Sequence, residues 1–263
     1  MPPIRSANIN VMDQAARKAA RHLIRDFGEV EQLQVSIKGP GDFVSAADRK
    51  AEKILRNELA RARPNFGFLL EESGEIPSKD GHRWIIDPLD GTSNFLHGIP
   101  HFSISIGLEW HGDLIAGLVY DPLKDETFVA EKGAGAFLNE RRIRVSRRSN
   151  LQRCMIGTGI PVLNWPGREK GFARQLDRVC DKVAGVRRLG TASLDLAYVA
   201  AGRLDGFWEY GLKPWDIAAG MVLVREAGGH VDHLEGDQSW SEQGTLVASN
   251  ADIHTPLKSV LQG

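Results

Sequence analysis

Short apolar runs that have the length of strands limit this chain to few folds. They span residues 66–70, 83–86, 104–110, 114–120 and 127–130. The last three follow one another at hairpin-like intervals, which is typical of an antiparallel meander. Two segments with apolar residues at helical spacing precede them, from about Ser6 to Phe27 and from near Ser45 to just before Pro64. A segment with Gly and Pro at 38–42 separates these helices and is predicted to be a loop. The first part of the chain is therefore predicted to be α+β.

The pattern changes after a polar and basic stretch at 139–150, NERRIRVSRRSN. Beyond it, helical patterns alternate with short strand-like runs, as in α/β proteins. The helical patterns lie at 171–183, 191–201 and 215–227, and the strand-like runs at 206–208 and 229–232. A chain of 263 residues can form one large domain or two fused halves. We predict an N-terminal α+β half, residues 1–145, and a C-terminal α/β half, residues 146–263.

The charge balance restricts the class of partner. A net charge of −1 argues against nucleic acid or an anionic membrane as the main partner, so an anion must be bound at a local site. The densest basic stretch, Arg141 to Arg148, could bind RNA or an acidic partner, but no aromatic side chain interleaves it, which favours a solvated segment. Because no run of about 18 apolar residues and no signal-peptide core occurs, we predict no membrane span. Two cysteines, Cys154 and Cys180, exclude a disulfide scaffold and fit a reducing cytoplasm.

Carboxylate side chains stand where predicted strands end and where a helix begins. They are Glu71 and Glu72 after one strand, Asp87 and Asp90 after another, and Asp216 at the start of a helix. Side chains at such positions project from a rigid frame into a crevice, where ligand sites collect. Converging carboxylates repel one another unless a cation lies between them, and oxygen ligands select Mg²⁺, Ca²⁺ or Mn²⁺ over Zn²⁺. The sequence therefore predicts a site for a hard divalent cation.

The segment from Asp87 to Thr92 makes this prediction more specific. Proline after Asp87 fixes the chain, so both aspartates can face one cavity with the Leu89 carbonyl between them. Gly91 lets the backbone approach a ligand closely, and Thr92 with the following amides can open a helix that binds phosphate. The Thr92 hydroxyl can also position and deprotonate a water molecule. Taken alone, however, Asp-Pro-x-Asp-Gly is typical of a turn.

Three segments resemble the signatures of the inositol monophosphatase family. They are Glu-Glu-Ser at 71–73, Trp-Ile-Ile-Asp-Pro-Leu-Asp-Gly-Thr-Ser-Asn-Phe at 84–95 and Lys-Pro-Trp-Asp-Ile-Ala-Ala-Gly at 213–220. The resemblance runs from the first helix to beyond residue 248 and is closest to bacterial cytoplasmic members. It implies an α+β plus α/β fold of the five-layer αβαβα sandwich type, and Mg²⁺-dependent hydrolysis of small phosphate monoesters, above all inositol 1-phosphate. It further implies a cytoplasmic homodimer that Li⁺ inhibits.

The resemblance also implies roles for single residues. One Mg²⁺ would be held by Glu71, Asp87 and the Leu89 carbonyl. A second would be held by Asp87, Asp90 and Asp216, and a weaker third ion would contact Glu71. Glu71 and Thr92 would activate the attacking water. The implied substrate-binding residues are Asp90, Gly91, Thr92, Ala192 and Glu209, and the implied supporting residues are Lys38 and Asp48. Glu72 is interpreted as a solvated or capping residue.

Alternatives remain within and beyond the enzyme class. Ser93-Asn94-Phe95 resembles the inositol-type continuation Thr-Asn-Phe, but Ser93 is also similar to the Ser-Asn of fructose bisphosphatases. Sugar (bis)phosphates therefore stay open as substrates, as do the nucleotide 3′-phosphates and histidinol phosphate of sibling phosphatases. The same fold could instead serve as an interaction protein of the transcription machinery, with phosphatase activity secondary. The intact set of carboxylates favours the enzyme.

Overall fold

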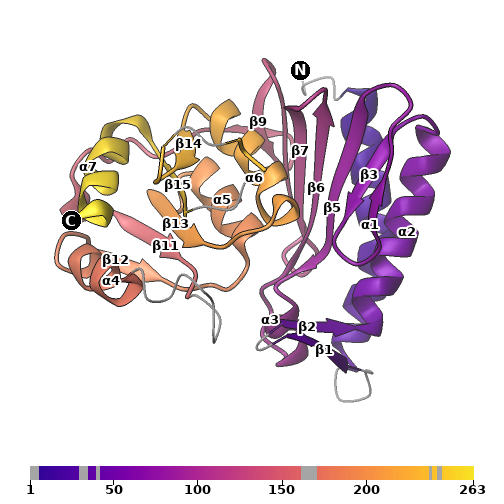
Figure 1. Ribbon diagram of the computed structural model, residues 1–263, viewed down its shortest axis with the longest axis horizontal. Coiled ribbons are helices and arrows are strands. Elements are labelled where there is room, and N and C mark those ends of the chain that lie inside the picture. Colours follow the sequence, from indigo (N-terminus) through magenta and orange to yellow (C-terminus); the bar gives the residue numbers. More distant parts are fainter. Residues whose placement is uncertain (1–5, 30–34, 40–41, 161–170, 237–238, 242–244) are drawn as a thin grey trace.

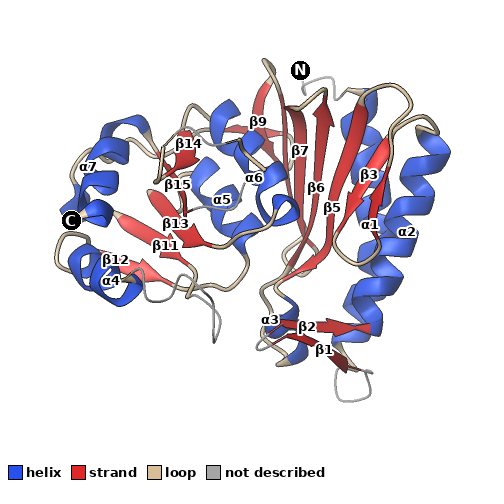
Figure 2. Ribbon diagram, in the orientation of Figure 1, coloured by secondary structure: helices blue, strands red, loops and turns tan. Residues whose placement is uncertain are grey.

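In the residues that the structure describes, two large β-sheets alternate with three layers of helices, and β1 and β2 form a separate two-stranded sheet (Figure 1). The structure is a computed structural model, and it describes residues 6–29, 35–39, 42–160, 171–236, 239–241 and 245–263. Figure 2 shows the layers by type of element: α1 and α2 lie outermost on one side, α5 and α6 lie between the sheets, and α4 and α7 lie outermost on the other side. The predicted five-layer αβαβα sandwich is confirmed.

The helices and strands have the following bounds. The helices are α1 (Ala7–Phe27), α2 (Ala46–Ala62), α3 (Thr92–Leu96), α4 (Phe172–Cys180), α5 (Ala192–Ala200), α6 (Pro214–Glu226) and α7 (Ala251–Gln262). The strands are β1 (Val35–Gly39), β2 (Asp42–Ser45), β3 (Gly67–Leu70), β4 (Gly74–Ile76), β5 (His82–Asp90), β6 (Ser103–Trp110), β7 (Asp113–Asp121), β8 (Glu126–Glu131), β9 (Gly135–Leu138), β10 (Arg141–Ile143), β11 (Met155–Thr158), β12 (Gly185–Arg187), β13 (Gly206–Tyr210), β14 (His230–His233) and β15 (Thr245–Ser249).

The larger sheet has eight strands in the order β10-β9-β8-β7-β6-β5-β3-β4. From β5 to β10 the neighbours follow one another in the chain and run antiparallel, which confirms the predicted meander. β3, in contrast, pairs in parallel with β5, because the chain between them first forms β4 at the edge of the sheet. The basic stretch at 139–150 begins as strand β10 and so belongs in part to this sheet. The boundary at residue 145 stays a prediction.

Side chains on β5 alternate between two hydrophobic cores, since successive residues of a strand point to opposite faces. Trp84 and Ile86 pack in the core that α1 and α2 cover, whereas Ile85 packs in the core shared with α5 and α6. All three side chains are fully buried. A strand covered on both faces has to be apolar throughout, which explains the unbroken apolar run before Asp87.

Helix α6 lies across β6 and β7 at very short range. A Cβ at Gly107 would stand 2.8 Å from the Cβ of Ala218, and a Cβ at Gly117 would overlap the carbonyl of Ala219. The glycines of the sheet are therefore matched to the alanines of the helix, and no larger residue fits at either position. The Ser105 hydroxyl on β6 also donates to the carbonyl of Trp215 at 3.2 Å. This packing holds the first turn of α6 beside the end of β5.

The smaller sheet has five strands in the order β12-β11-β13-β15-β14. β11 pairs in parallel with β12 and β13, and β15 pairs antiparallel with β13 and β14. Along the chain, α4 connects β11 to β12 and α5 connects β12 to β13, as the alternating pattern predicted. A third hydrophobic core joins the outer face of this sheet to α4 and α7. In the described part of the chain, no helix is long and apolar enough to cross a membrane.

The loop predicted at 38–42 is wrong in part, because β1 and β2 form an antiparallel hairpin. Lys38, a predicted supporting residue, lies in strand β1. For the strands of this hairpin, the structure describes the backbone only. Residues 40 and 41 lie outside the described residues. Glycine and proline are typical of hairpin connections as well as of longer loops, so composition did not separate the two possibilities.

Candidate active site

A bulge near the end of β5 places two aspartates at one site. Asp87 pairs opposite Ser105 and Asp90 opposite Ser103, so β5 carries one more residue than β6 over this interval. Residues three apart on a regular strand point to opposite faces, and one extra residue brings them to the same side. The amide of Leu89 donates to Asp87 Oδ1 at 2.9 Å and stabilises the bulge.

Two further carboxyl groups reach this site from other elements. Glu71 directly follows β3, the parallel neighbour of β5, and its amide donates to the carbonyl of Ile86 at 3.2 Å. Asp216 lies in the first turn of α6, where its Oδ2 accepts a hydrogen bond from the amide of Lys213 at 2.7 Å. Pro214 occupies the first helical position, where a missing N–H costs nothing.

The four carboxyl groups change one another's protonation. Burial, and then the charges of Glu71, Asp90 and Asp216, raise the pKa of Asp87 well above its usual range. A hydrogen bond between the carboxyl groups of Asp87 and Glu71 adds to this rise of the pKa. Burial also raises the pKa of Asp90 to about 6 and that of Asp216 well above its usual range. The structure thus brings together side chains that the sequence placed at the ends of three separate segments.

The donor set fits a hard divalent cation. It consists of carboxylates and the carbonyl of Leu89, and oxygen donors select Mg²⁺ over Zn²⁺. A cation would replace the protons that otherwise relieve the repulsion among the carboxylates. Among the described residues, no group of three or more His, Cys, Asp or Glu side chains stands in a geometry that could hold a metal ion.

Thr92 begins helix α3, as the sequence predicted. Its hydroxyl lies 3.0 Å from Asp48 Oδ1 and 3.0 Å from the carbonyl of Leu89, and it can donate to either. Asp48 is fully buried, so its carboxylate is held in place beneath Thr92. Gly91 precedes the helix with a φ of +94°, and a Cβ there would stand 2.5 Å from Thr191 Oγ1. Only glycine combines this φ with this contact.

Ala192 and Glu209 reach the site from the C-terminal part of the chain. Ala192 is the first residue of α5, and the amide of the next residue, Ser193, donates to Asp90 Oδ2 at 2.7 Å. The carboxyl group of Glu209, on β13, covers Gly159 so closely that a Cβ there would overlap Glu209 Oε1. Burial, and then the charge of Asp90, raise the pKa of Glu209 to about 8. Both residues predicted to contact the alcohol part of the substrate thus lie near Asp90.

Known proteins match this chain over almost its whole length. Residues 6–262 match the family described as "Inositol monophosphatase family". The chain belongs to the inositol monophosphatase family. An inositol-1-monophosphatase from Mesorhizobium japonicum is 57% identical over 254 residues, which cover 96% of this chain and 95% of that protein. The solved structure of the extragenic suppressor protein suhB from Bartonella henselae has a TM-score of 0.94 and 56% identity, and the match covers 98% of this chain and 99% of that one. The Nus factor SuhB of Pseudomonas aeruginosa is 42% identical, with 97% of this chain and 95% of that protein covered.

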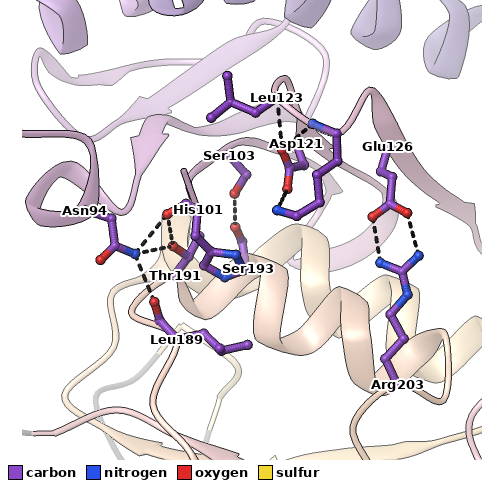
Figure 3. A network of polar contacts seen from close by, with 11 residues as sticks. Asn94, His101, Ser103, Asp121, Leu123, Glu126, Leu189, Thr191, Ser193 and Arg203 are labelled. Carbon is purple, nitrogen blue, oxygen red and sulfur yellow. Dashed lines mark hydrogen bonds and ion pairs between the residues drawn. The ribbon is translucent and has the colours of Figure 1, made fainter. Parts of the chain in front are cut away.

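Two contacts of this inositol monophosphatase site were not predicted from the sequence. One is the amide of Ser193 on Asp90, which joins residues 103 apart in the chain. The other is the side chain of Asn94, which donates to the carbonyls of His101 and Leu189 and is shown with its partners in Figure 3. A backbone amide leaves no signal in a sequence, and the Asn94 partners are carbonyls that every residue carries. Neither contact could therefore be found before the fold was known.

The raised pKa values predict how stability depends on pH in the metal-free inositol monophosphatase fold. The pKa values of Asp90 and Glu209 rise to about 6 and about 8 from ordinary values of 3.8 and 4.5. At intermediate pH the folded protein therefore keeps protons on Asp90 and Glu209 that the unfolded chain releases. The contribution of these two groups to the free energy of unfolding is fully present below about pH 4 and is lost as the pH rises through 6 and 8. We expect the rise in melting temperature caused by Mg²⁺ to be larger at about pH 8.5 than at about pH 5.5, because Mg²⁺ binds the ionised carboxylates. Thermal melts with and without Mg²⁺ measure this, and an increment independent of pH would contradict it.

Proposed function

We propose that this chain is an inositol-1-monophosphatase, which hydrolyses inositol 1-phosphate to inositol and phosphate with Mg²⁺ as cofactor. The observation that carries the proposal is the 57% identity to an inositol-1-monophosphatase over 96% of this chain and 95% of that protein. The four interacting carboxyl groups support it, because they provide oxygen donors for divalent ions next to a helix start that can receive a phosphate. As part of the same proposal, the enzyme is a cytoplasmic homodimer.

The proposed cation ligands come from three elements that the fold brings to one place. Glu71, Asp87 and the Leu89 carbonyl would hold one Mg²⁺, and Asp87, Asp90 and Asp216 would hold a second. A weaker third ion would contact Glu71. Two such ions, when bound, supply Lewis-acid stabilisation to both the attacking and the leaving oxygen of an in-line displacement. The protein contributes the spacing of the carboxylates, which the β5 bulge and the packing of α6 set.

The proposed route for the proton of the attacking water runs through Thr92. Because the Thr92 hydroxyl lies 3.0 Å from Asp48 Oδ1, it can donate its own proton to that buried carboxylate and accept one from the water. Glu71 would assist in activating this water, as the family resemblance implies. The amides of Gly91 and Thr92 bind the phosphate, and Asp90, Ala192 and Glu209 contact the hydroxyl groups of the inositol ring. Lys38 has a supporting role, from strand β1.

Removal of the metal tests the cofactor, and a substrate panel tests the specificity. We expect chelation by EDTA to reduce phosphate release to the uncatalysed level and added Mg²⁺ to restore it, because the carboxylates alone repel both each other and the phosphate. Inositol 1-phosphate should have the highest kcat/KM among inositol 1-phosphate, fructose 1,6-bisphosphate, a nucleotide 3′-phosphate and histidinol phosphate. Li⁺ should inhibit the reaction. Full activity after exhaustive chelation would disprove the metal-dependent mechanism, and a preference for the bisphosphate would move the chain to the sugar phosphatases.

A second candidate function is suggested by relatives named Nus factor SuhB, of which the Pseudomonas aeruginosa protein is 42% identical. We propose that a role in transcription would use a surface outside the carboxylate site. An antitermination reporter in cells that lack the endogenous protein separates the two functions. If the wild-type chain and an Asp87→Asn variant restore the reporter equally, the second function exists beside catalysis. If neither restores it, the chain is an enzyme alone in this respect.

A further inference from the structure

The side-chain amide of Asn94 joins two segments that lie far apart in the sequence. Asn94 is 5% exposed, and its Nδ2 donates to the carbonyl of His101 at 2.8 Å and to the carbonyl of Leu189 at 2.9 Å. A primary amide carries two N–H donors, so both are used by these two carbonyls. One carbonyl belongs to the loop before β6 and the other to the segment that leads into α5. We call this meeting of residues 94–103 with residues 189–193 the α5 junction (Figure 3).

Further contacts of the α5 junction lie on either side of Asn94. The hydroxyl of Thr191 donates to the carbonyl of His101 at 3.1 Å, and the same oxygen fills the space where a Cβ at Gly91 would stand. The hydroxyls of Ser103 and Ser193 are hydrogen-bonded at 2.8 Å, and both residues are fully buried. The α5 junction is therefore stabilised by buried hydrogen bonds between uncharged groups. Removing one partner of such a bond leaves the other polar atom unsatisfied, which destabilises the fold.

The α5 junction ends at a proposed metal ligand. Four residues after Leu189, the amide of Ser193 donates to Asp90 Oδ2 at 2.7 Å, and the hydroxyl of Ser193 and the amide of Ala192 also hydrogen-bond Asp90. The orientation of the Asp90 carboxyl group thus depends on where the first turn of α5 lies. That place is set by two anchors: the Leu189 carbonyl accepts from Asn94 of α3, and the Thr191 hydroxyl donates to the His101 carbonyl in the loop before β6.

We propose that Asn94 is a positioning residue for the reaction: by holding the carbonyls of His101 and Leu189 together, it sets the first turn of α5 and so orients Asp90 toward the metal ions. The same anchoring sets the distance from the carboxylates to Ala192, on the side of the substrate alcohol. This inference rests on the proposed function, because it assigns Asn94 an effect on Mg²⁺ binding through Asp90. Partners that orient a metal ligand typically contribute about 10–100-fold to metal affinity or activity.

The test compares Asn94→Leu with a matched variant outside the junction. Leucine has nearly the shape of asparagine but donates no hydrogen bond. Gln175 is the control: it is also a buried amide, 7% exposed, which donates to the carbonyl of Leu261 at 2.9 Å, but it lies in the outer layer between α4 and α7. Gln175→Met removes that donor and also the acceptor of the Tyr210 hydroxyl, and neither of these hydrogen bonds involves a residue of the α5 junction. Both variants should lose thermal stability, because each removes the hydrogen bonds of a buried side-chain amide.

Two readouts decide the outcome. The first uses Mg²⁺ without substrate: the Mg²⁺ concentration that gives half of the maximal rise in melting temperature should increase about 10–100-fold in Asn94→Leu and stay unchanged in Gln175→Met. The second is kcat for inositol 1-phosphate at one Mg²⁺ concentration, which should fall about 10–100-fold in Asn94→Leu only. If Asn94→Leu keeps the wild-type Mg²⁺ midpoint and kcat, or if Gln175→Met loses as much, the positioning role is disproved.

A second pair of variants keeps the proposal testable if Asn94→Leu does not fold. Thr191→Val removes the hydroxyl bond to His101 but keeps the side-chain shape, whereas Thr191→Ser keeps the hydroxyl. Thr191→Val should need more Mg²⁺ for the same midpoint and Thr191→Ser should restore the wild-type value; equal midpoints would overturn the proposal. Asp90→Asn separates this failure from that of the proposed function. If Asp90→Asn leaves Mg²⁺ binding intact, the metal site itself is wrong, whereas if it abolishes binding while Asn94→Leu has no effect, only the role of Asn94 is wrong.

Discussion

Replacing Asp87 or Asp90 by asparagine should each lower kcat/KM for inositol 1-phosphate about 10³-fold or more. Each change removes a charged ligand of the proposed Mg²⁺ ions, and a catalytic ion contributes several kcal/mol to the transition state, where about 1.4 kcal/mol corresponds to a factor of ten. Steady-state phosphate release at saturating Mg²⁺ measures the loss. The expected deficit is in rate and in Mg²⁺ affinity together, because the two aspartates are assigned to the same ions.

The matched control is Glu72→Gln. Glu72 follows Glu71 directly, its amide donates to the carboxylate of Glu52 at 2.8 Å, and its side chain is not assigned to an ion. We expect Glu72→Gln to change kcat/KM less than about threefold, as is usual for substitutions that leave the ligands in place. If Glu72→Gln were the most damaging of the three variants, the assignment of the two glutamates would have to be exchanged.

Stability distinguishes loss of a ligand from loss of the fold. Burial and neighbouring charges raise the pKa of Asp87, so its ionised form is unfavourable in the metal-free protein. Asparagine removes this charge and can still accept the hydrogen bond from the Leu89 amide. The melting temperature of metal-free Asp87→Asn should therefore equal or exceed that of the wild type at neutral pH, while the increment from Mg²⁺ should shrink. A variant that is inactive because it is unfolded would show the opposite.

Replacing Thr92 by valine should slow the chemical step about 10²–10⁴-fold, the usual contribution of a positioned proton acceptor or donor. Valine is β-branched like threonine, so the start of α3 should keep its geometry. The variant loses the hydroxyl that lies 3.0 Å from Asp48 Oδ1. Single-turnover kinetics at saturating Mg²⁺ isolate the chemical step, and Thr92→Ser, which keeps the hydroxyl, is the control. A normal chemical step in Thr92→Val would show that the ions alone activate the water and that Thr92 serves only the helix start.

Combining Thr92→Val with Glu71→Gln tests whether the two residues act as a unit. Glu71→Gln alone should lower both Mg²⁺ affinity and rate, because Glu71 is assigned to an ion and to the attacking water. Residues that act together on one step are not additive, so the double variant should be little slower than the slower single one. If the two effects multiply instead, Thr92 and Glu71 act on different steps.

Much of this protein followed from its sequence. The short apolar runs and the helical patterns predicted the meander, α1, α2 and α4 to α6, because burial in a core requires apolar side chains along a covered strand and at helical spacing along a helix. The acidic segments at 71–73, 84–95 and 213–220 predicted the carboxylate site and the family. These sequence signals are strong because they are local. Each signature places its carboxylate at the end of one strand or at the start of one helix, and this does not depend on where the other carboxylates lie in the chain.

The tertiary structure alone decided how these segments meet. The parallel pairing of β3 with β5 puts Glu71 beside Asp87, the extra residue in β5 turns Asp90 to the same side, and the close packing of α6 on Gly107 and Gly117 brings in Asp216. The hydrogen bonds of Thr92 with Asp48, of the Ser193 amide with Asp90 and of Asn94 with the Leu189 carbonyl likewise join distant segments. A sequence records which groups are available, but backbone amides and carbonyls are the same at every residue. Which of them a side chain finds is therefore determined only when the sheets and helices have packed.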